Sequence, residues 1–145
     1  MMRSICAKNP EVPLLYSIPE CLRHNSMIEL SGQMLQSGRF RVDLKNGYYE
    51  PDGDIAFHLS VRPSLYEIVR NHKENKKWQE EENEGGCPIE YGGQFKILIF
   101  VENDMIKVCI DNCSFCEFRP RLPLSSAKFL YICGDVTIHY VKIIQ

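Results

Sequence analysis

Apolar and polar residues alternate with a period of two along most of this chain. Turn residues interrupt the alternation at intervals of roughly eight to twelve positions, which is typical of strands that bury one face. The pattern is clearest over residues 54–62, "DIAFHLSVR". It predicts a strand with one apolar face, Ile55, Phe57, Leu59 and Val61, and one more polar face, Ala56, His58, Ser60 and Arg62.

About ten segments carry this signal, and none shows the periodicity of an amphipathic helix. They are residues 26–35, 38–47, 54–62, 66–71, 77–83, 93–103, 105–112, 114–120, 128–135 and 136–145, and the second of them closes at the turn pair Asn46-Gly47. Many short strands joined by turns predict an all-β fold, a two-sheet antiparallel β-sandwich. The expected core is Ile55, Phe57, Leu59, Phe95, Ile97, Ile99, Val108, Ile110, Leu130 and Ile132.

Length and composition indicate one domain over residues 1–145, with residues 1–10 as a flexible N-terminal arm. The formal net charge of −2 and the acidic run over residues 80–84 argue against nucleic acid as a partner. No stretch is apolar enough to enter a membrane, and the N-terminus lacks the apolar core of a signal peptide. We therefore expect a cytoplasmic protein.

Seven cysteines, an odd number, favour free thiols in a reducing compartment over a disulfide framework. Cys113 and Cys116 form a C-x-x-C pair. A zinc site would need a second pair at comparable spacing, and a redox site would need a helix N-terminus, whereas this region reads as strand. We expect small apolar side chains or exposed thiols here, with no metal and no cofactor.

Polar side chains recur on three consecutive predicted strands, and a single tryptophan accompanies them. The first strand presents His58, Ser60 and Arg62, the second ends at Asn71, and the third presents Trp78, Glu81 and Asn83. If these strands are neighbours, the side chains form one polar patch with an indole at its edge. The alternative to a binding patch is a strand face that is polar because it contacts solvent, followed by a charged, solvent-exposed hairpin.

Such a patch has the chemistry of a sugar site. A pyranose offers hydroxyls that need donors and acceptors, and one C–H face that packs on an aromatic ring. Arg62 supplies forked donors, Asn71 a donor and an acceptor, and Trp78 the apolar platform. An enzyme with His58 and Glu81 as base and acid is disfavoured, because no nucleophile, oxyanion-stabilising loop or cofactor motif accompanies them.

The motif order resembles that of the galectins, the lectins that bind β-galactosides. Their signature is H-x-N-x-R, an Asn after a valine-rich strand, and W-x-x-E-x-R, and here "HLSVR", "IVRN" and "WQEEEN" follow in that order. The likeness continues through "GRFRVDLKNG", "GGQFKILIFVENDMIKVCIDN" and "FRPRLPLSSAKFLYICGDVTI". It implies a jelly-roll sandwich that binds galactose-containing glycans or glycoproteins without metal. It also implies that the protein can be exported without a signal peptide.

The resemblance also implies roles for individual residues. His58 and Arg62 would bind the galactose 4-hydroxyl, with Arg62 held by Glu81. Asn71 would contact the 6-hydroxyl, Glu81 the neighbouring sugar, and Trp78 the apolar face of galactose.

Two departures from the signature bear on binding. Ser60 stands where the family has Asn, and Asn83 stands where it has Arg. The segment between Arg62 and Asn71 is also short, and Pro63 stiffens its start. Two lost hydrogen bonds would lower affinity about ten- to a hundredfold.

Two hypotheses follow: a galectin-like lectin of weakened or altered specificity, or a galectin-fold protein that has lost sugar binding. The second would act through protein contacts, including a homodimer on sheet edges such as residues 136–145.

Overall fold

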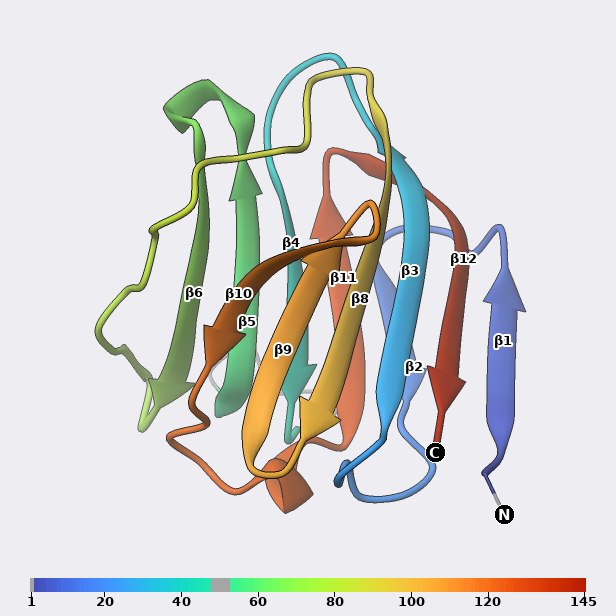
Figure 1. The fold of residues 1–145 in the computed structure, drawn as a ribbon, viewed down its shortest axis with the longest axis vertical. Helices are drawn as coiled ribbons and strands as arrows, with labels where there is room; N and C mark the ends of the chain where they lie inside the picture. The colour runs from blue at the N-terminus through green and yellow to red at the C-terminus, as the bar shows by residue number, and fades with distance from the viewer. Residues whose placement is uncertain (1, 48–52) are drawn as a thin grey trace.

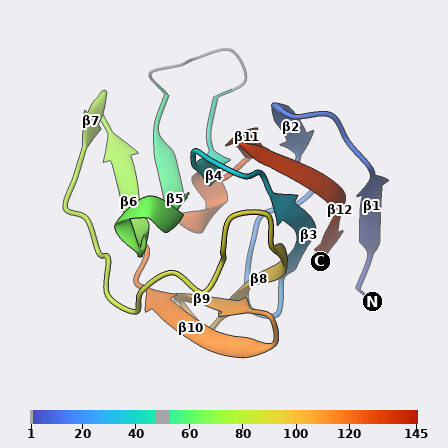
Figure 2. The same ribbon diagram turned by 90° about the horizontal axis from the view of Figure 1, so that it is seen from above.

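The chain folds into two six-stranded antiparallel sheets that pack face to face, as the computed structural model shows for residues 2–47 and 53–145 (Figures 1 and 2). The predicted two-sheet antiparallel β-sandwich is therefore confirmed. The β3 sheet has the strand order β1 (Ser4–Lys8), β12 (Val136–Ile144), β3 (Met27–Met34), β8 (Gln94–Glu102), β9 (Met105–Ile110) and β10 (Cys113–Phe118). The β5 sheet has the order β2 (Leu14–Ser17), β11 (Phe129–Gly134), β4 (Phe40–Lys45), β5 (Ile55–Arg62), β6 (Glu67–Glu74) and β7 (Lys77–Trp78).

The core lies between the two sheets, where the apolar positions of the alternating strands meet. All ten predicted core residues are buried, and all but Ile55 belong to one contiguous apolar cluster. Two aromatic pairs join the layers. The Phe40 and Phe95 rings stack with centroids 5.2 Å apart, and the Phe57 and Phe118 rings lie tilted with centroids 5.0 Å apart. This core fixes one face of β4 and β5 and leaves the other face outside the sandwich.

The N-terminus differs from the prediction of a flexible arm over residues 1–10. Residues 4–8 form β1, which pairs with β12 from Ser4 opposite Ile144 to Lys8 opposite Tyr140. The prediction is wrong for these residues because they pair with the backbone of β12. The sequence of a five-residue segment gives no local signal of such a distant partner. For the same reason β12 is not an exposed edge, since it lies between β1 and β3.

The structure differs from the prediction at three other places. No tight turn forms at Asn46-Gly47. The Asn46 amide instead donates to the Asp54 carbonyl, at the start of a longer connection between β4 and β5. Part of this connection lies outside the described residues. The strand predicted over residues 77–83 is reduced to the two residues of β7 and an isolated bridge between Arg70 and Glu82. Strand β2 was not predicted at all.

Helical structure is minimal in the described part of the chain. It consists of two 3₁₀ turns of three residues each, η1 (Pro63–Leu65) and η2 (Leu124–Ser126). Neither could span a bilayer.

The aromatic pairs between the sheets should dominate stability. We expect Phe57→Ala to lower the free energy of unfolding by about 3–5 kcal/mol, because the ring is fully buried and its loss leaves a cavity against Phe118. Urea titration followed by circular dichroism measures this. The matched control is Leu65→Ala at an exposed position. Equal stability of the two variants would contradict the assignment of Phe57 to the core.

Candidate functional site

Strand β5 divides its side chains between the core and the outer face of the β5 sheet, as the alternation predicts. Phe57, Leu59 and Val61 are buried inside. His58, Ser60 and Arg62 alternate with them and line a cavity of about 320 Å³ on the outer face. The complete lining is Arg39, Arg41, His58, Ser60, Arg62, Asn71, Trp78 and Glu81. The structure thus brings six of the seven predicted site residues together, and Asn83 lies outside the lining.

Antiparallel register explains why these residues meet. On β4, Arg41 pairs with Ser60 and Asp43 with His58. On the other side of β5, Asn71 of β6 pairs with His58. Strand β7 then places Trp78 beside β6, where the indole is 42% exposed and its ring centroid lies 4.4 Å from that of His58. The cavity is a shallow trough across four neighbouring strands, with an aromatic ring at one side.

A buried carboxylate fixes the floor of this cavity. The Asp43 side chain is fully buried, and its Oδ1 lies 2.6 Å from Nδ1 of His58. Its Oδ2 lies 3.0 Å from Nε of Arg41, in an ion pair that is bent away from ideal hydrogen-bond geometry. The carboxylate therefore holds the proton on Nδ1 of His58, which leaves Nε2 for a ligand.

Arg62 lies between two carboxylates. Its Nη1 is 3.9 Å from Oε1 of Glu67, and its Nη2 is 3.9 Å from Oε2 of Glu81. Its Nε donates to Oγ of Ser60 at 3.1 Å. The guanidinium is therefore oriented by Ser60, while its Nη atoms remain loosely paired at the cavity wall.

Arg121, from the loop after β10, determines the orientation of Asn71. Its Nη1 donates to Oδ1 of Asn71 at 3.3 Å and to the Glu80 carbonyl at 2.8 Å, and its Nη2 lies 2.7 Å from Oε2 of Glu82. Asn71 Nδ2 in turn donates to the Gln79 carbonyl at 3.1 Å. This network ties the segment after β7, which carries Glu81, to β6. One Nδ2–H of Asn71 remains for a ligand.

Four residues of the site were missed by the sequence analysis. A signal existed for Arg39, Arg41 and Asp43, because period-two alternation places them on the polar face of residues 38–47. Arg121 gave no signal, since it reaches Asn71 from 50 positions away along the chain.

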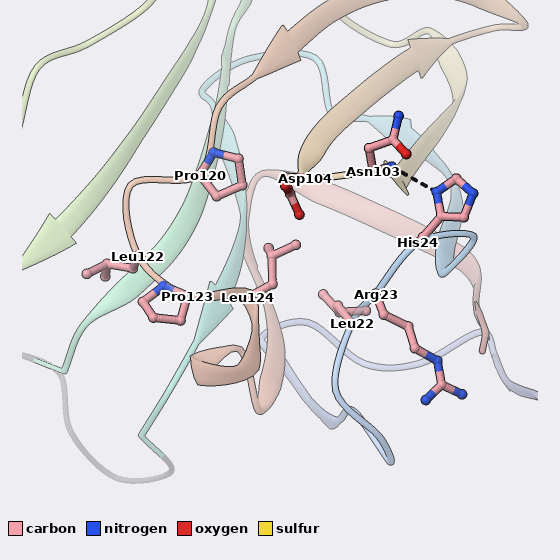
Figure 3. A pocket seen from close by; sticks show the side chains of 9 residues that line it. All are labelled: Leu22, Arg23, His24, Asn103, Asp104, Pro120, Leu122, Pro123 and Leu124. Carbon is pink, nitrogen blue, oxygen red and sulfur yellow. Dashed lines mark hydrogen bonds between the residues drawn. The ribbon is translucent and has the colours of Figure 1, made fainter.

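A second hollow, of about 530 Å³, lies at another part of the molecule (Figure 3). It is formed by the segment before β3, the turn between β8 and β9 and the loop after β10. Three leucines and two prolines line it together with Arg23, His24, Asn103 and Asp104. The hydrogen bond drawn within it runs from the Asn103 backbone amide to Nδ1 of His24 and is 2.8 Å long. No phenylalanine, tyrosine or tryptophan lines it, whereas in the first cavity Trp78 lies beside the converging polar side chains, so we take the first cavity as the candidate site.

Comparison with known proteins agrees with the geometry. The sequence profile of the Galactoside-binding lectin family matches residues 13–143. The chain belongs to the galectin family. Human galectin-7 is 33% identical over 133 residues, which cover 91% of this chain and 97% of that protein. The 32 kDa beta-galactoside-binding lectin of Caenorhabditis elegans is 31% identical over 136 residues, covering 92% of this chain and 48% of the relative. The solved structure of a human galectin-16 variant superposes with a TM-score of 0.85 at 26% identity, covering 96% of this chain and 99% of that chain.

In this galectin, Asn83 lies outside the cavity lining and contacts a residue beside Arg62. Its Nδ2 donates to Oε2 of Glu67 at 3.1 Å, and Glu67 faces Arg62. Asn83 can therefore influence Arg62 through Glu67. Its predicted role in binding stays a prediction.

The C-x-x-C pair lies on strand β10, away from the candidate site. Burial raises the pKa of the Cys116 thiol to about 11, so this thiol stays protonated at neutral pH, while Cys113 is exposed. Cys116 therefore behaves as a small apolar side chain, in keeping with the interpretation made from the sequence.

The Asp43 carboxylate should be essential to the floor of the site. We expect Asp43→Ala to lower the free energy of unfolding by about 3–5 kcal/mol, because it leaves buried groups of His58 and Arg41 without their partner. Asp43→Asn should recover part of this loss, since its amide oxygen still accepts from Nδ1 of His58. Chemical denaturation checks both, with Asp104→Ala at an exposed turn as the control. A loss no larger than that of Asp104→Ala would show that the carboxylate does not organise the site.

Proposed function

We propose that this galectin binds β-galactosides in the cavity that His58, Arg62, Asn71, Trp78 and Glu81 line. The observation that carries the proposal is the convergence of these side chains, from β5, β6, β7 and the segment after β7, on one trough with a half-exposed indole beside it. The nematode relative, whose name states that it binds β-galactosides, supports the same ligand class.

The arrangement suits one hexose ring and the start of the next. Trp78 offers a flat apolar surface for the C–H face of galactose. His58 Nε2 and the Arg62 guanidinium form hydrogen bonds with the 4-hydroxyl, and the free Nδ2–H of Asn71 donates to the 6-hydroxyl. Glu81, exposed at the end of the trough, accepts from hydroxyls of the neighbouring sugar. No metal is needed, because protein donors and acceptors serve the 4- and 6-hydroxyls and the neighbouring sugar.

Ser60 reduces affinity without removing the site. Its hydroxyl accepts a hydrogen bond from Nε of Arg62 and so orients the guanidinium. The serine side chain is too short to reach a sugar as an asparagine amide would. A hydrogen bond contributes about 0.5–1.5 kcal/mol, which corresponds to roughly a twofold to tenfold change in affinity. We therefore propose weak lactose binding.

The protein is proposed to act in the cytosol and, after export, on cell-surface glycans. All seven cysteines are free, which suits a reducing compartment.

Lactose binding can be tested directly through Trp78, the one tryptophan of the chain. We expect retention on immobilised lactose and a lactose-dependent change in tryptophan fluorescence. Trp78→Ala should abolish retention because the ring platform is gone. Phe100→Ala, a partly exposed aromatic on the outer face of the β3 sheet, is the matched control and should be retained. Absence of both retention and fluorescence change in the parent protein would overturn the proposal.

A second candidate, a galectin-fold protein whose sugar site has decayed, is favoured by Ser60 and Asn83. The double variant Ser60→Asn, Asn83→Arg separates the two. If the site is functional, the parent protein binds lactose and the double variant binds it about tenfold more tightly, by one or two added hydrogen bonds. Isothermal titration calorimetry measures both. Binding by the double variant alone would establish decay in the parent protein.

A further inference from the structure

A buried histidine, His72, adjoins the candidate site without lining it. It follows Asn71 on β6 and is 5% exposed. Its backbone amide donates to Oδ1 of Asn71 at 2.8 Å, and its carbonyl accepts from the Gln79 amide at 3.2 Å. Both nitrogens of its ring also have partners, and the chemistry of these partners determines which protonation state of the ring fits.

The contacts of the ring require neutral His72. Nη1 of Arg121 lies 3.2 Å from Nδ1, and a guanidinium nitrogen can only donate, so Nδ1 is the acceptor. The proton of the neutral ring is then on Nε2, which donates to Oε1 of Glu74 at 3.1 Å. A second proton would sit on Nδ1 and point at the Arg121 guanidinium, which places two positive charges side by side.

Charged groups from three elements face this histidine or its guanidinium partner. Glu74, on β6 itself, favours the charged ring, whereas Arg121, from the loop after β10, opposes it. Glu82, from the segment after β7, places Oε2 2.7 Å from Nη2 of Arg121 and holds that guanidinium. Arginine is permanently charged, and histidine is the side chain that ordinarily changes charge between about pH 5 and about pH 8. The ring of His72 is therefore the group whose charge can change the network at mildly acidic pH.

Arg121 connects this histidine to the sugar site. Its Nη1 also donates to the Glu80 carbonyl at 2.8 Å and to Oδ1 of Asn71 at 3.3 Å. The first of these bonds holds the backbone directly before Glu81, the carboxylate in the cavity lining. If a charged imidazole displaces the guanidinium, this backbone is released, whereas Asn71 keeps its hydrogen bonds to the main chain. The effect therefore falls on Glu81 more than on Asn71.

We propose that His72 is a pH-sensitive positioning residue: its protonation at mildly acidic pH releases Glu81 and weakens binding of the sugar next to galactose. This inference rests on the proposed function. The neutral ring is the form that fits the network. Binding is therefore strongest above the pH range in which the imidazole titrates, and it weakens as the pH falls through that range. A glycan bound at neutral pH is released more readily in an acidic compartment.

The experiment compares lactose with methyl β-galactoside by NMR titration of the full chain, at about pH 7.5 and at about pH 5.5, on either side of the usual histidine range. Lactose carries a second sugar for Glu81, and methyl β-galactoside does not. We expect lactose affinity to fall about tenfold at the lower pH, from the loss of one hydrogen bond to a charged group, and methyl β-galactoside affinity to fall less. A charge change at His58 would affect both ligands, since His58 is proposed to bind the galactose ring.

The variant His72→Gln assigns the effect to the histidine. The glutamine amide is uncharged at both pH values, and its oxygen can still accept from Arg121. We expect its lactose affinities at the two pH values to agree within about twofold, less than the effect of a charged hydrogen bond. His24→Gln is the matched control, because His24 also accepts from an N–H, the Asn103 amide at 2.8 Å, but lies in the other hollow. It should keep the full pH response.

Amide hydrogen exchange tests the release without any ligand. The Glu82 amide donates to the Arg70 carbonyl at 2.8 Å, in the bridge that joins the released segment to β6. Its protection, corrected for the intrinsic effect of pH on exchange, should fall between the two pH values in the parent protein and stay nearly constant in His72→Gln.

The outcomes separate this inference from the proposed function. Equal pH responses for the two sugars overturn the inference and leave galactoside binding intact, and so does a full response in His72→Gln. If that variant does not fold, the comparison of the two sugars in the parent protein decides. If neither sugar binds at either pH, the proposed function fails. The exchange measurement then decides alone: a loss of Glu82 protection that His72→Gln removes supports the switch, and constant protection overturns it.

Discussion

The buried carboxylate of Asp43 is the interaction on which the outer face of the β5 sheet depends. A carboxylate without water is tolerated only when cations or donors surround it, and here one imidazole and one guanidinium approach its two oxygens. The two groups come from different strands, so the same contact fixes the side-chain positions of β4 and β5. The cavity is therefore organised before any ligand arrives, and little side-chain entropy is lost on binding.

Strand β5 imposes a second constraint, because both of its faces are occupied. Phe57 packs against Phe118 in the core, while its neighbour His58 lies against Trp78 in the cavity. A shift of one residue in register would exchange the two sets of side chains. Stability and recognition are thus coupled through a single strand, and the aromatic pairs between the sheets hold the geometry that the polar face requires.

Sequence periodicity could predict what depends on local alternation. It predicted the sandwich, the ten buried core positions and the polar face of His58, Ser60 and Arg62, because each follows from a period of two. It could not predict β1 and β2, whose five and four residues become strands only through pairing with β12 and β11. Nor could it show Arg121, whose contacts cross the chain, or the end of β7 at Trp78, where the glutamate-rich segment leaves the sheet apart from one bridge.

The placement of the chain ends has a practical consequence. Both termini lie together at the β1 side of the molecule (Figure 1). The Gln145 side chain accepts a hydrogen bond from the Glu20 amide and donates one to the Glu20 carbonyl. Strands β6 and β7 lie at the opposite side (Figure 2). A spacer, fluorophore or second lectin module fused at either end would stand clear of the trough. This geometry makes the domain suitable for oriented attachment to a chip or bead.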